Sequence, residues 1–289
     1  MLPAMAHAVT HPSPPRLANA GAARLHQVCV WQDNFAWILE CTATGECAVV
    51  DGPEAGPILA YVAEHGLNLT TILTTHTHPD HIGVHRELAK RGELGRYRVV
   101  GNRELAGVIP GLDQAGAEPV DEGDVVRLGQ LEGRVLLTEG HIDGHLSYVF
   151  GELLFCGDTL FAGGCGYLFD GPPAKMHASL ERLAALPEPT LVCCAHEYTQ
   201  DNLRFAASVE PGNQALRDRV AEVEALRARG EASVPSTIAV ERATNPFLRT
   251  DSAELQATLA RELPELPRAT PAEIFAATRK LKDLKRYKG

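Results

Sequence analysis

Apolar residues in the first half of the chain occur in short runs that alternate with polar residues and end at turn-forming residues. Such runs are typical of β-strands. The first three are separated by Asp33-Asn34 and Thr44-Gly45, and they cover Gln27 to Trp31, Phe35 to Cys41 and Glu46 to Val50. This arrangement predicts a β-meander near the N-terminus.

Strand-like and helix-like spacings both follow this meander, and the balance between them changes along the chain. Further strands are predicted over residues 71–74, 97–101, 124–128, 134–138, 146–150, 153–156 and 190–194. Helices are predicted over residues 57–65, 81–91, 174–186, 199–209, 213–229, 253–261 and 271–282. Helices predominate after His196. The change predicts an α/β body, residues 25–197, followed by a helical region, residues 198–289.

The first 24 residues differ in character from the rest. They are rich in Ala and Pro, contain no acidic residue and lack the continuous apolar run of a signal peptide. We predict a disordered extension over residues 1–24. No run elsewhere approaches the roughly 20 apolar residues of a membrane helix, so no membrane partner is expected.

Composition narrows the class of protein and its surroundings. The chain has 289 residues, of which 45% are apolar and 22% charged, as in ordinary globular proteins. Its net charge of -10 disfavours nucleic acid as a partner, because nucleic acids attract basic surfaces. The seven cysteines, which include the adjacent pair Cys193-Cys194, do not follow a secreted disulfide pattern. We therefore expect a reducing compartment, the cytoplasm.

The residues with the most evident chemistry lie directly after the apolar run 71–74. There the segment Thr75-His76-Thr77-His78-Pro79-Asp80-His81 places four metal-capable side chains within six residues. Side chains two residues apart on an extended segment point the same way, so His76 and His78 can share one ion. Asp80 and His81 can serve a second ion, and two ions together can clamp an attacking hydroxide and a substrate oxygen.

Three more metal-capable residues stand just after apolar strands. They are His141, Asp158 and His196, which follow the runs 135–137, 153–156 and 191–194. Strand carboxyl ends in α/β folds gather ligand-binding loops at one edge of the sheet. The recurrence of this pattern predicts that the three residues join the His76 to His81 cluster in one centre.

The segment Thr75 to His81 resembles the His-x-His-x-Asp-His signature of the metallo-β-lactamase superfamily. Later segments are similar to one branch of it, the glyoxalase II or hydroxyacylglutathione hydrolase family, and these are Thr138 to His145, Cys156 to Phe161, Gly164 to Gly166, His196 to Thr199, Val209 to Asn213 and Asn245 to Arg249. The resemblance runs from about Asp33 to the C-terminus. It implies an αββα sandwich as the catalytic domain and a C-terminal helical domain that binds substrate.

The resemblance also implies the metal ligands and the reaction. All seven metal-capable residues match family ligands: His76, His78 and His141 for the first ion, Asp80, His81 and His196 for the second, and Asp158 as the bridge. Zinc is the expected ion, and iron or manganese also suits ligands without thiolate. The implied reaction is hydrolysis of a thiolester, S-D-lactoylglutathione, by a metal-bridging hydroxide that Asp80 helps to orient.

The substrate contacts that the resemblance implies lie far apart in the chain. Tyr198, Arg279 and Lys282 match positions that bind glutathione, whose carboxylates require a basic pocket. Tyr167 departs from the family, which usually has Lys or Arg there, and Phe169 stands where some members have Tyr. The missing cation removes a charge-assisted contact worth about 1.5 to 3 kcal/mol. Another thiolester or a lactone is therefore an alternative substrate.

Other possibilities follow from the same residues. Persulfide dioxygenases share the fold and keep one iron, but the complete second set of ligands argues against a single ion. The protein is expected to act on a small molecule as a monomer or small homo-oligomer. Asp33-Asn34 and Asp51 are expected to shape turns, His145 to make a structural hydrogen bond and His85 to lie at the surface.

Overall fold

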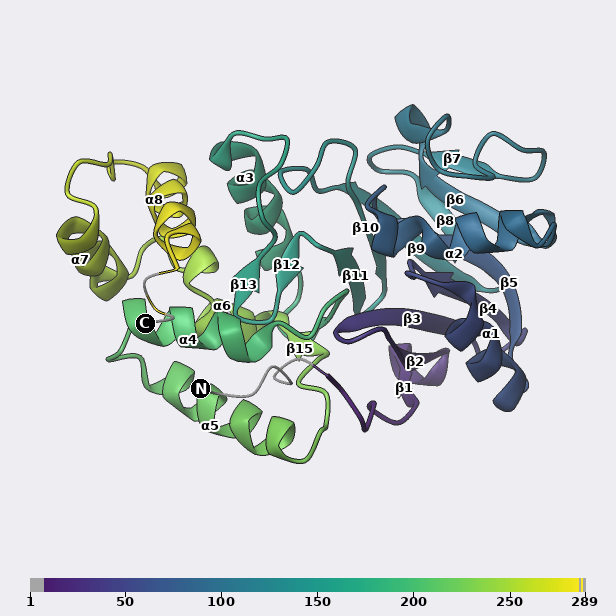
Figure 1. Ribbon diagram of the computed structural model, residues 1–289, viewed down its shortest axis with the longest axis horizontal. Coiled ribbons are helices and arrows are strands. Elements are labelled where there is room, and N and C mark those ends of the chain that lie inside the picture. The colour runs from purple at the N-terminus through teal and green to yellow at the C-terminus, as the bar shows by residue number, and fades with distance from the viewer. Residues whose placement is uncertain (1–7, 286, 288–289) are drawn as a thin grey trace.

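The computed structural model, which describes residues 8–285 and 287, contains two large β-sheets that enclose a common core (Figure 1). The first sheet has the spatial order β1 (Arg16–Ala18), β2 (Ala23–Val30), β3 (Asn34–Cys41), β4 (Glu46–Val50), β5 (Asn68–Leu73), β6 (Arg98–Asn102) and β7 (Glu118–Val120). The second has the order β15 (Ser236–Thr237), β14 (Leu191–Cys194), β11 (Leu153–Gly157), β10 (Leu146–Phe150), β9 (Leu131–Leu137) and β8 (Val125–Leu128). A separate hairpin joins β12 (Leu160–Phe161) to β13 (Gly164–Cys165).

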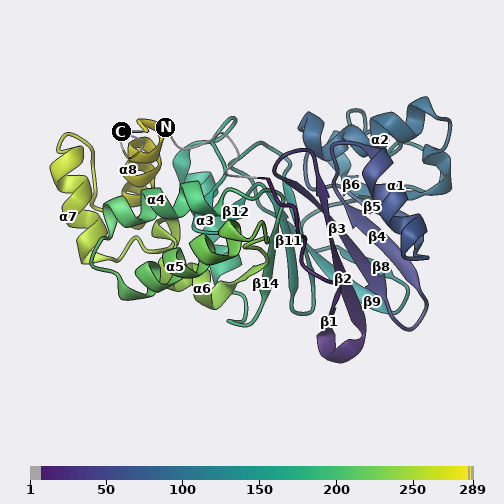
Figure 2. The same ribbon diagram turned by 60° about the horizontal axis from the view of Figure 1, so that its bottom comes forward.

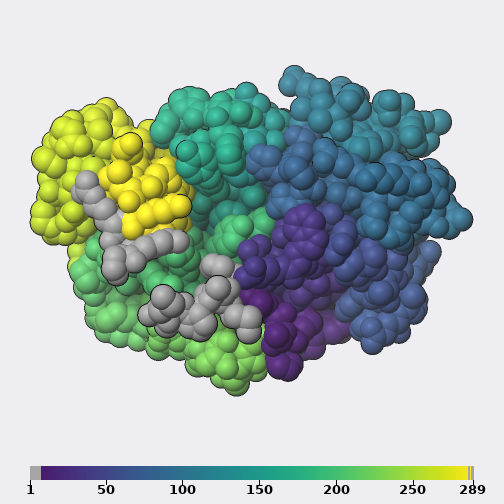
Figure 3. All heavy atoms as spheres, in the orientation of Figure 1, coloured from purple at the N-terminus to yellow at the C-terminus, as the bar shows by residue number. Residues whose placement is uncertain are grey.

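Eight helices accompany the sheets within the described residues. They are α1 (Ala55–Glu64), α2 (Pro79–Lys90), α3 (Pro173–Ala184), α4 (Thr199–Val209), α5 (Gln214–Ala228), α6 (Ile238–Thr244), α7 (Ala253–Glu262) and α8 (Pro271–Asp283). Helices α1 and α2 cover the outer face of the first sheet (Figure 2), while α3 contributes to the core of the second sheet and contacts α8. Figure 3 shows the α1 and α2 region at one end of the molecule and the C-terminal helices at the other.

Side chains that alternate between the two faces of the first sheet explain this layering. In β3, Phe35, Trp37 and Leu39 face the core between the two sheets, whereas Ala36 and Ile38 face the core under α1 and α2. Successive side chains of a strand point to opposite faces, so a strand that is apolar at every position is buried on both sides. The predicted αββα sandwich followed by helices is confirmed.

Strand direction then decides where the polar loops gather. Strands β4, β5, β6 and β7 pair in parallel, so their carboxyl ends lie at one edge of the sheet. Asp51 directly follows β4, and the segment Thr75 to His81 follows β5 and enters α2. This edge therefore carries the polar cluster that the sequence predicted.

The N-terminal prediction needs correction. Residues 16–18 and 23–24, expected to be disordered, belong to the first sheet, because Arg16–Ala18 pairs antiparallel with residues 23–25 of β2. A 3-10 turn over Asn19–Gly21 joins the two strands. Residues 1–7 lie outside the described part of the chain. A strand of three residues carries no periodic signal, and its hydrogen bonds depend on a partner strand that sequence spacing does not identify. The division into a catalytic domain, 25–197, and a helical domain, 198–289, stays a proposal.

Several short elements have no counterpart among the predicted ones, namely β7, β12, β13, β15 and α6. Between residues 8 and 285, none of the helices combines the length and the apolar character needed to cross a bilayer.

Candidate metal centre and adjoining cavity

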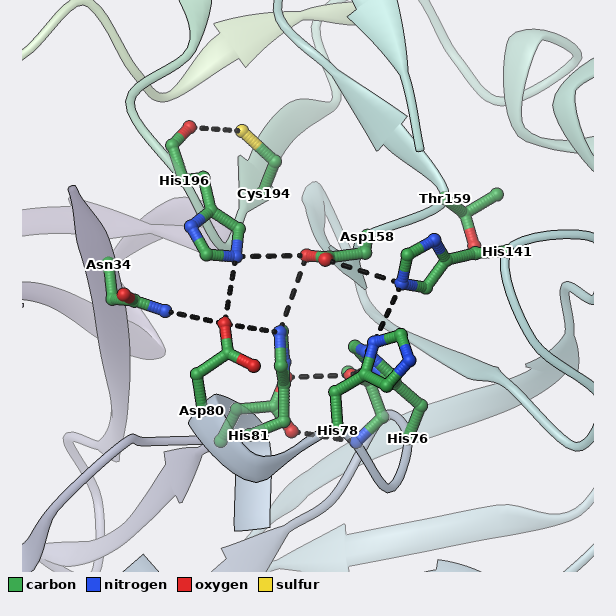
Figure 4. Close-up of polar contacts among 12 residues, drawn as sticks. Asn34, His76, His78, Asp80, His81, His141, Asp158, Thr159, Cys194 and His196 are labelled. Carbon is green, nitrogen blue, oxygen red and sulfur yellow. Dashed lines mark hydrogen bonds and ion pairs between the residues drawn. The ribbon is translucent and has the colours of Figure 1, made fainter. Parts of the chain in front are cut away.

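Four chain segments bring the metal-capable side chains together (Figure 4). His76 and His78 follow β5, and Asp80 and His81 lie in the first turn of α2. The other three follow strands of the second sheet: His141 after β9, Asp158 after β11 and His196 after β14. Pro79 occupies the start of α2, so Asp80 stands where the positive end of the helix dipole favours a carboxylate.

The first group consists of His76, His78 and His141, with nitrogen atoms that face one another. His78 Nδ1 lies 3.1 Å from His76 Nε2 and 3.0 Å from His141 Nε2. One oxygen of Asp158, Oδ2, is 3.5 Å from His141 Nε2. Four potential ligand atoms thus lie within 4.8 Å of one another.

The second group consists of Asp80, His81 and His196. Asp80 Oδ2 lies 3.6 Å from His81 Nε2 and 3.3 Å from His196 Nε2. The other oxygen of Asp158, Oδ1, is 3.5 Å from each of these two nitrogens. Asp158 therefore turns one oxygen toward each group.

Outer hydrogen bonds fix which nitrogen faces the centre in three of the rings. His141 Nδ1 lies 2.7 Å from the Tyr167 carbonyl oxygen. Because a carbonyl oxygen can only accept, His141 Nδ1 is the donor. His81 Nδ1 lies 2.9 Å from Asp51 Oδ2, and His196 Nδ1 lies 3.0 Å from Asp33 Oδ1. A proton on Nδ1 leaves the Nε2 lone pair directed inward, as metal ligation requires.

The centre has the features expected of residues that bind cations. His81 Nε2 and Asp158 Oδ1 are buried and have no hydrogen-bond partner among the described residues. Buried polar atoms rarely remain unpaired, and inward-facing imidazole lone pairs repel one another unless a cation lies between them. The two His and Asp clusters suit a site for two divalent metal ions.

Burial and neighbouring charges together shape the electrostatics of the centre. Burial lowers the pKa of His76 and His141, which keeps both rings neutral. Burial also opposes protonation of His196, but the nearby carboxylates, Asp158 first, raise its pKa to about 9. Burial disfavours charge on Asp158, yet His196 and His81 hold its pKa well below the usual value.

Sequence reasoning missed the part that Asp33, Asn34 and Asp51 play in orienting the metal-capable side chains. They were expected only to shape turns, and Asp51 does have a left-handed backbone with φ 56°. Asn34 Nδ2 also donates to Asp80 Oδ2 at 3.1 Å. The signal available in the sequence was position, since Asp51 directly follows an apolar strand as Asp158 does.

A cavity of about 600 Å³ adjoins the centre, and we name it the cation cavity. Its lining includes Phe161, Cys165, Tyr167, Tyr198, Arg279 and Lys282. The Tyr198 ring stacks on His196 with centroids 4.6 Å apart, and the carbonyl of Tyr167 accepts from His141. The cavity therefore begins at the metal centre and ends at two cations of α8.

Both cations are largely buried. Arg279 and Lys282 are each 7% exposed. Arg279 Nη1 donates to the Cys165 carbonyl at 3.4 Å, and its Nε has no partner among the described residues. Lys282 Nζ donates to Asn202 Oδ1, and burial lowers the pKa of Lys282 to about 8. Arg279 Nη2 also pairs with Asp283 Oδ1. The cavity lining carries three cations, Arg279, Lys282 and Lys285, against the two carboxylates of Asp201 and Asp283, and this positive balance suits an anionic ligand.

Tyr167 and Phe169 lie at the mouth of the site and are more than half exposed. Phe169 is outside the cavity lining, and its ring meets His78 and His141 edge-on, with centroids 5.1 and 5.3 Å away. Tyr167 and Phe169 contact each other at 4.9 Å. The two rings form an aromatic rim beside the first group.

The two remaining histidine predictions have different outcomes. His145 is buried and its Nε2 accepts from the Asp158 backbone N–H at 3.2 Å, the structural hydrogen bond that was predicted. The surface position expected for His85 is wrong, because His85 is fully buried and pairs with Thr74 Oγ1 at 2.9 Å. It lies on the same face of α2 as His81 and Leu88, four and three residues away, and this face packs on the sheet.

Comparison with known families now defines the class. The profile of the metallo-beta-lactamase superfamily matches residues 31–196 and places the chain in this superfamily. A second profile, described as hydroxyacylglutathione hydrolase C-terminus, matches residues 197–284. The hydroxyacylglutathione hydrolase of Rhodospirillum rubrum is 46% identical over 261 residues, covering 90% of this chain and 97% of that protein. That of Methylococcus capsulatus is 45% identical over 260 residues, covering 89% and 97%.

The chain therefore belongs to the hydroxyacylglutathione hydrolase family, and it is a metal-dependent thiolester hydrolase. Solved structures agree on the fold. ETHE1 from Myxococcus xanthus aligns with a TM-score of 0.58 at 27% identity, covering 90% of this chain and 98% of that one. TTHA1623 in a di-iron-bound form aligns with a TM-score of 0.52 at 25% identity, covering 78% and 99%.

Proposed function

We propose that the chain hydrolyses hydroxyacylglutathione thiolesters, in particular S-D-lactoylglutathione, to a hydroxy acid and glutathione. The observation that carries this proposal is the placement of Asp158, whose two oxygens face two separate ligand groups beside a cavity with two buried cations. Relatives that match about nine tenths of the chain are named hydroxyacylglutathione hydrolase.

We assign all seven metal-capable residues as ligands: His76, His78 and His141 to the first ion, Asp80, His81 and His196 to the second, and Asp158 to both. Two divalent cations in such a site lower the pKa of water and stabilise charge on a carbonyl oxygen. Zinc is the proposed ion. Iron is also supported, because the related TTHA1623 is known in a di-iron-bound form.

Beside the metal ions, the reaction requires a group that orients the attacking water. Asp80 is the catalytic residue, since its carboxylate faces the centre and Asn34 holds its orientation. Because its burial is only partial, Asp80 can also accept a hydrogen bond from an attacking water. Thiolate is a good leaving group, so the reaction requires no strong general acid and no serine or cysteine nucleophile.

The thiol half of the substrate occupies the cation cavity in this proposal. Arg279 and Lys282 bind carboxylates of glutathione, and Tyr198 lines the path between them and the metal centre. Tyr167 and Phe169 contact the substrate at the rim. Because Tyr167 supplies an aromatic ring and no cation, a different thiolester or a lactone is the second candidate substrate.

Steady-state kinetics with metal-loaded protein test the proposal. We expect kcat/KM for S-D-lactoylglutathione to exceed that for S-lactoyl-N-acetylcysteamine and for simple lactones. Arg279→Met should lower kcat/KM roughly 10- to 100-fold for the glutathione ester, because a charge-assisted contact is lost. It should leave the cysteamine ester nearly unaffected. No turnover of the glutathione ester, with turnover of another thiolester or a lactone, would favour the second candidate.

The cellular location and the oligomeric state of the protein are also proposals. All seven cysteines are unpaired, which supports a cytoplasmic location, where thiols stay reduced. We propose a monomer or a small homo-oligomer whose partner is its small-molecule substrate.

A further inference from the structure

The segment Asn245-Pro246-Phe247 connects the two sides of the cation cavity. It follows α6 and begins the short 3-10 turn η4 (Pro246–Leu248). The side chains of Asn245 and Phe247 are buried, with exposures of 0% and 1%. Neither side chain lines the cavity itself. Their contacts explain why the turn matters to it.

Asn245 binds both strands of the β12–β13 hairpin with one amide group. Its Nδ2 donates to the Phe161 carbonyl at 3.2 Å and to the Gly164 carbonyl at 2.9 Å. The same Nδ2 lies 3.0 Å from Glu241 Oε2, so its two hydrogens are shared among three acceptors. Its Oδ1 accepts from the Phe247 backbone N–H at 3.1 Å, so the amide orientation is fixed.

Glu241 holds the same hairpin from one helical turn earlier. It is 1% exposed, and its Oε2 accepts from the Gly163 backbone N–H at 2.7 Å. Its Oε1 accepts from Ser236 Oγ at 2.5 Å. A buried carboxylate is costly unless it is hydrogen-bonded. Here Oε2 bonds to the hairpin and to Asn245, and Oε1 bonds to Ser236.

The hairpin forms one wall of the cation cavity. Phe161 packs edge-on against His196 and Tyr198, with centroids 5.9 and 5.4 Å away. The Cys165 carbonyl accepts from Arg279. A shift of this hairpin would therefore move the wall and the acceptor that orients Arg279.

Phe247 supports the opposite wall. The centroid of its ring lies 5.3 Å from Arg279 Cζ and 5.7 Å from Lys282 Nζ. A cation held over an aromatic face at this distance is attracted by the ring quadrupole. Two residues after Asn245, the same turn thus positions both cations of α8.

We propose that Asn245, Glu241 and Phe247 are positioning residues that set the spacing between the hairpin wall and the cation wall, and thereby the affinity for the thiol half of the substrate. This inference rests on the proposed function in taking glutathione as that thiol. The three side chains act through Phe161, Arg279 and Lys282.

Titration calorimetry with S-methylglutathione tests the proposal, because this thioether cannot be hydrolysed and reports binding alone. We expect Asn245→Ala to raise its Kd about tenfold. Asn213→Ala is the matched control: Asn213 caps α5 at Leu216 N and donates to the Ala243 carbonyl, away from the hairpin. The Asn213→Ala variant should lose stability but keep a Kd within about twofold of the wild-type value. An equal rise in Kd in the two variants, or an unchanged Kd in Asn245→Ala, would overturn the proposal.

Kinetics and a conservative variant give further readouts. Asn245→Ala should raise KM for S-D-lactoylglutathione with kcat within about threefold of the wild type, and change kcat/KM for S-lactoyl-N-acetylcysteamine less than twofold. Glu241→Gln should bind like the wild type because it keeps an acceptor for Gly163 N, whereas Glu241→Ala should bind weakly. A general loss of kcat on both esters would contradict a positioning role.

Two outcomes keep this inference separate from the proposed function. A wild-type protein that binds the thioether but does not hydrolyse the glutathione ester contradicts the proposed function alone. If Asn245→Ala does not fold, Phe247→Leu replaces it, since this change retains apolar volume and removes only the ring beneath the cations. Phe247→Leu with wild-type Kd would then contradict the inference.

Discussion

At the residue scale, the geometry of the metal centre depends on side chains that face away from it. Asp51 accepts hydrogen bonds from Thr75 N at 2.8 Å, Thr75 Oγ1 at 2.7 Å and His81 Nδ1 at 2.9 Å. Holding a non-glycine residue at φ 56° costs on the order of 1 kcal/mol or more. The three hydrogen bonds offset this strain and fix the His81 ring.

Asp51→Asn tests the orienting role. Asn tolerates the left-handed backbone, so the substitution removes the charge while keeping the turn. We expect metal affinity or kcat to fall about 10- to 100-fold, the usual effect of losing an outer partner of a ligand histidine. Metal content measured under chelator competition checks this. Asp121→Asn, in an exposed pair with Arg103, serves as the control. Equal metal retention by both variants would contradict the role.

The charge on Lys282 makes a pH dependence of binding predictable. Burial lowers its pKa to about 8, so the side chain is protonated below that pH and loses its charge as the pH rises through it. We expect KM for a glutathione thiolester to rise between pH 7.5 and 9. The same measurement on Lys282→Arg should show a smaller rise, because Arg stays charged. Since titration of the substrate affects both proteins equally, identical KM profiles would exclude Lys282 as the cause.

At the element scale, helix α2 reaches the centre only because it approaches the turn after β4 closely. A Cβ added at Gly83 would lie 1.9 Å from the Pro53 carbonyl oxygen. The backbones of the two segments also exchange hydrogen bonds, Gly52 N to His81 O at 3.1 Å and Val84 N to Gly52 O at 2.9 Å. This contact places the first turn of α2, with Asp80, beside the Asp51 turn.

Gly83→Ala should therefore force α2 away from the turn. We expect it to lower the free energy of unfolding by about 3 kcal/mol or more, as severe overpacking does, and to weaken metal binding as well. Thermal unfolding and metal analysis measure the two effects. Gly56→Ala in α1 is the matched control, because its Cβ would meet nothing within 4 Å, and it should be neutral or stabilising. A stable Gly83→Ala protein with full metal content would disprove the packing argument.

Short elements show where local sequence reasoning stops. The sequence predicts β3 because most of its eight residues are apolar, as in a strand that is buried on both faces. Strands β12 and β13 have two residues each, and tertiary hydrogen bonds from Asn245, Glu241 and Asn202 hold their hairpin. A two-residue strand has no periodicity, so only the packed structure reveals it.

At the scale of the whole molecule, the metal centre links parts of the chain that are far apart. Its side chains come from the edge of the first sheet, from α2 and from three strand ends of the second sheet. Without cations, inward-facing lone pairs and buried carboxylates would meet at the junction of the two sheets. Bound metal should therefore stabilise the whole fold.

Removing the metal tests this expectation. A ligand at 100 times its Kd that binds only the folded state adds about 2.7 kcal/mol, which is roughly 5 to 10 °C in Tm for a domain of this size. We expect chelation to lower Tm by at least this amount and added divalent metal to restore it. Asp158→Ala should show a smaller metal-dependent shift. A Tm that is independent of metal would contradict the linking role of the centre.

The sequence by itself determined the alternation that builds the buried strands, the helices of the second half, and the seven residues nominated as ligands. These follow from local periodicity and from motifs after strands, which are properties of neighbouring residues. Only the tertiary structure decided that Asp33 and Asp51 bond to His196 and His81, that Asn245 bonds to the β12–β13 hairpin, and that Phe247 lies beneath Arg279 and Lys282. Such contacts join segments that are tens to more than a hundred residues apart, and close approach between them is set by packing of the whole chain.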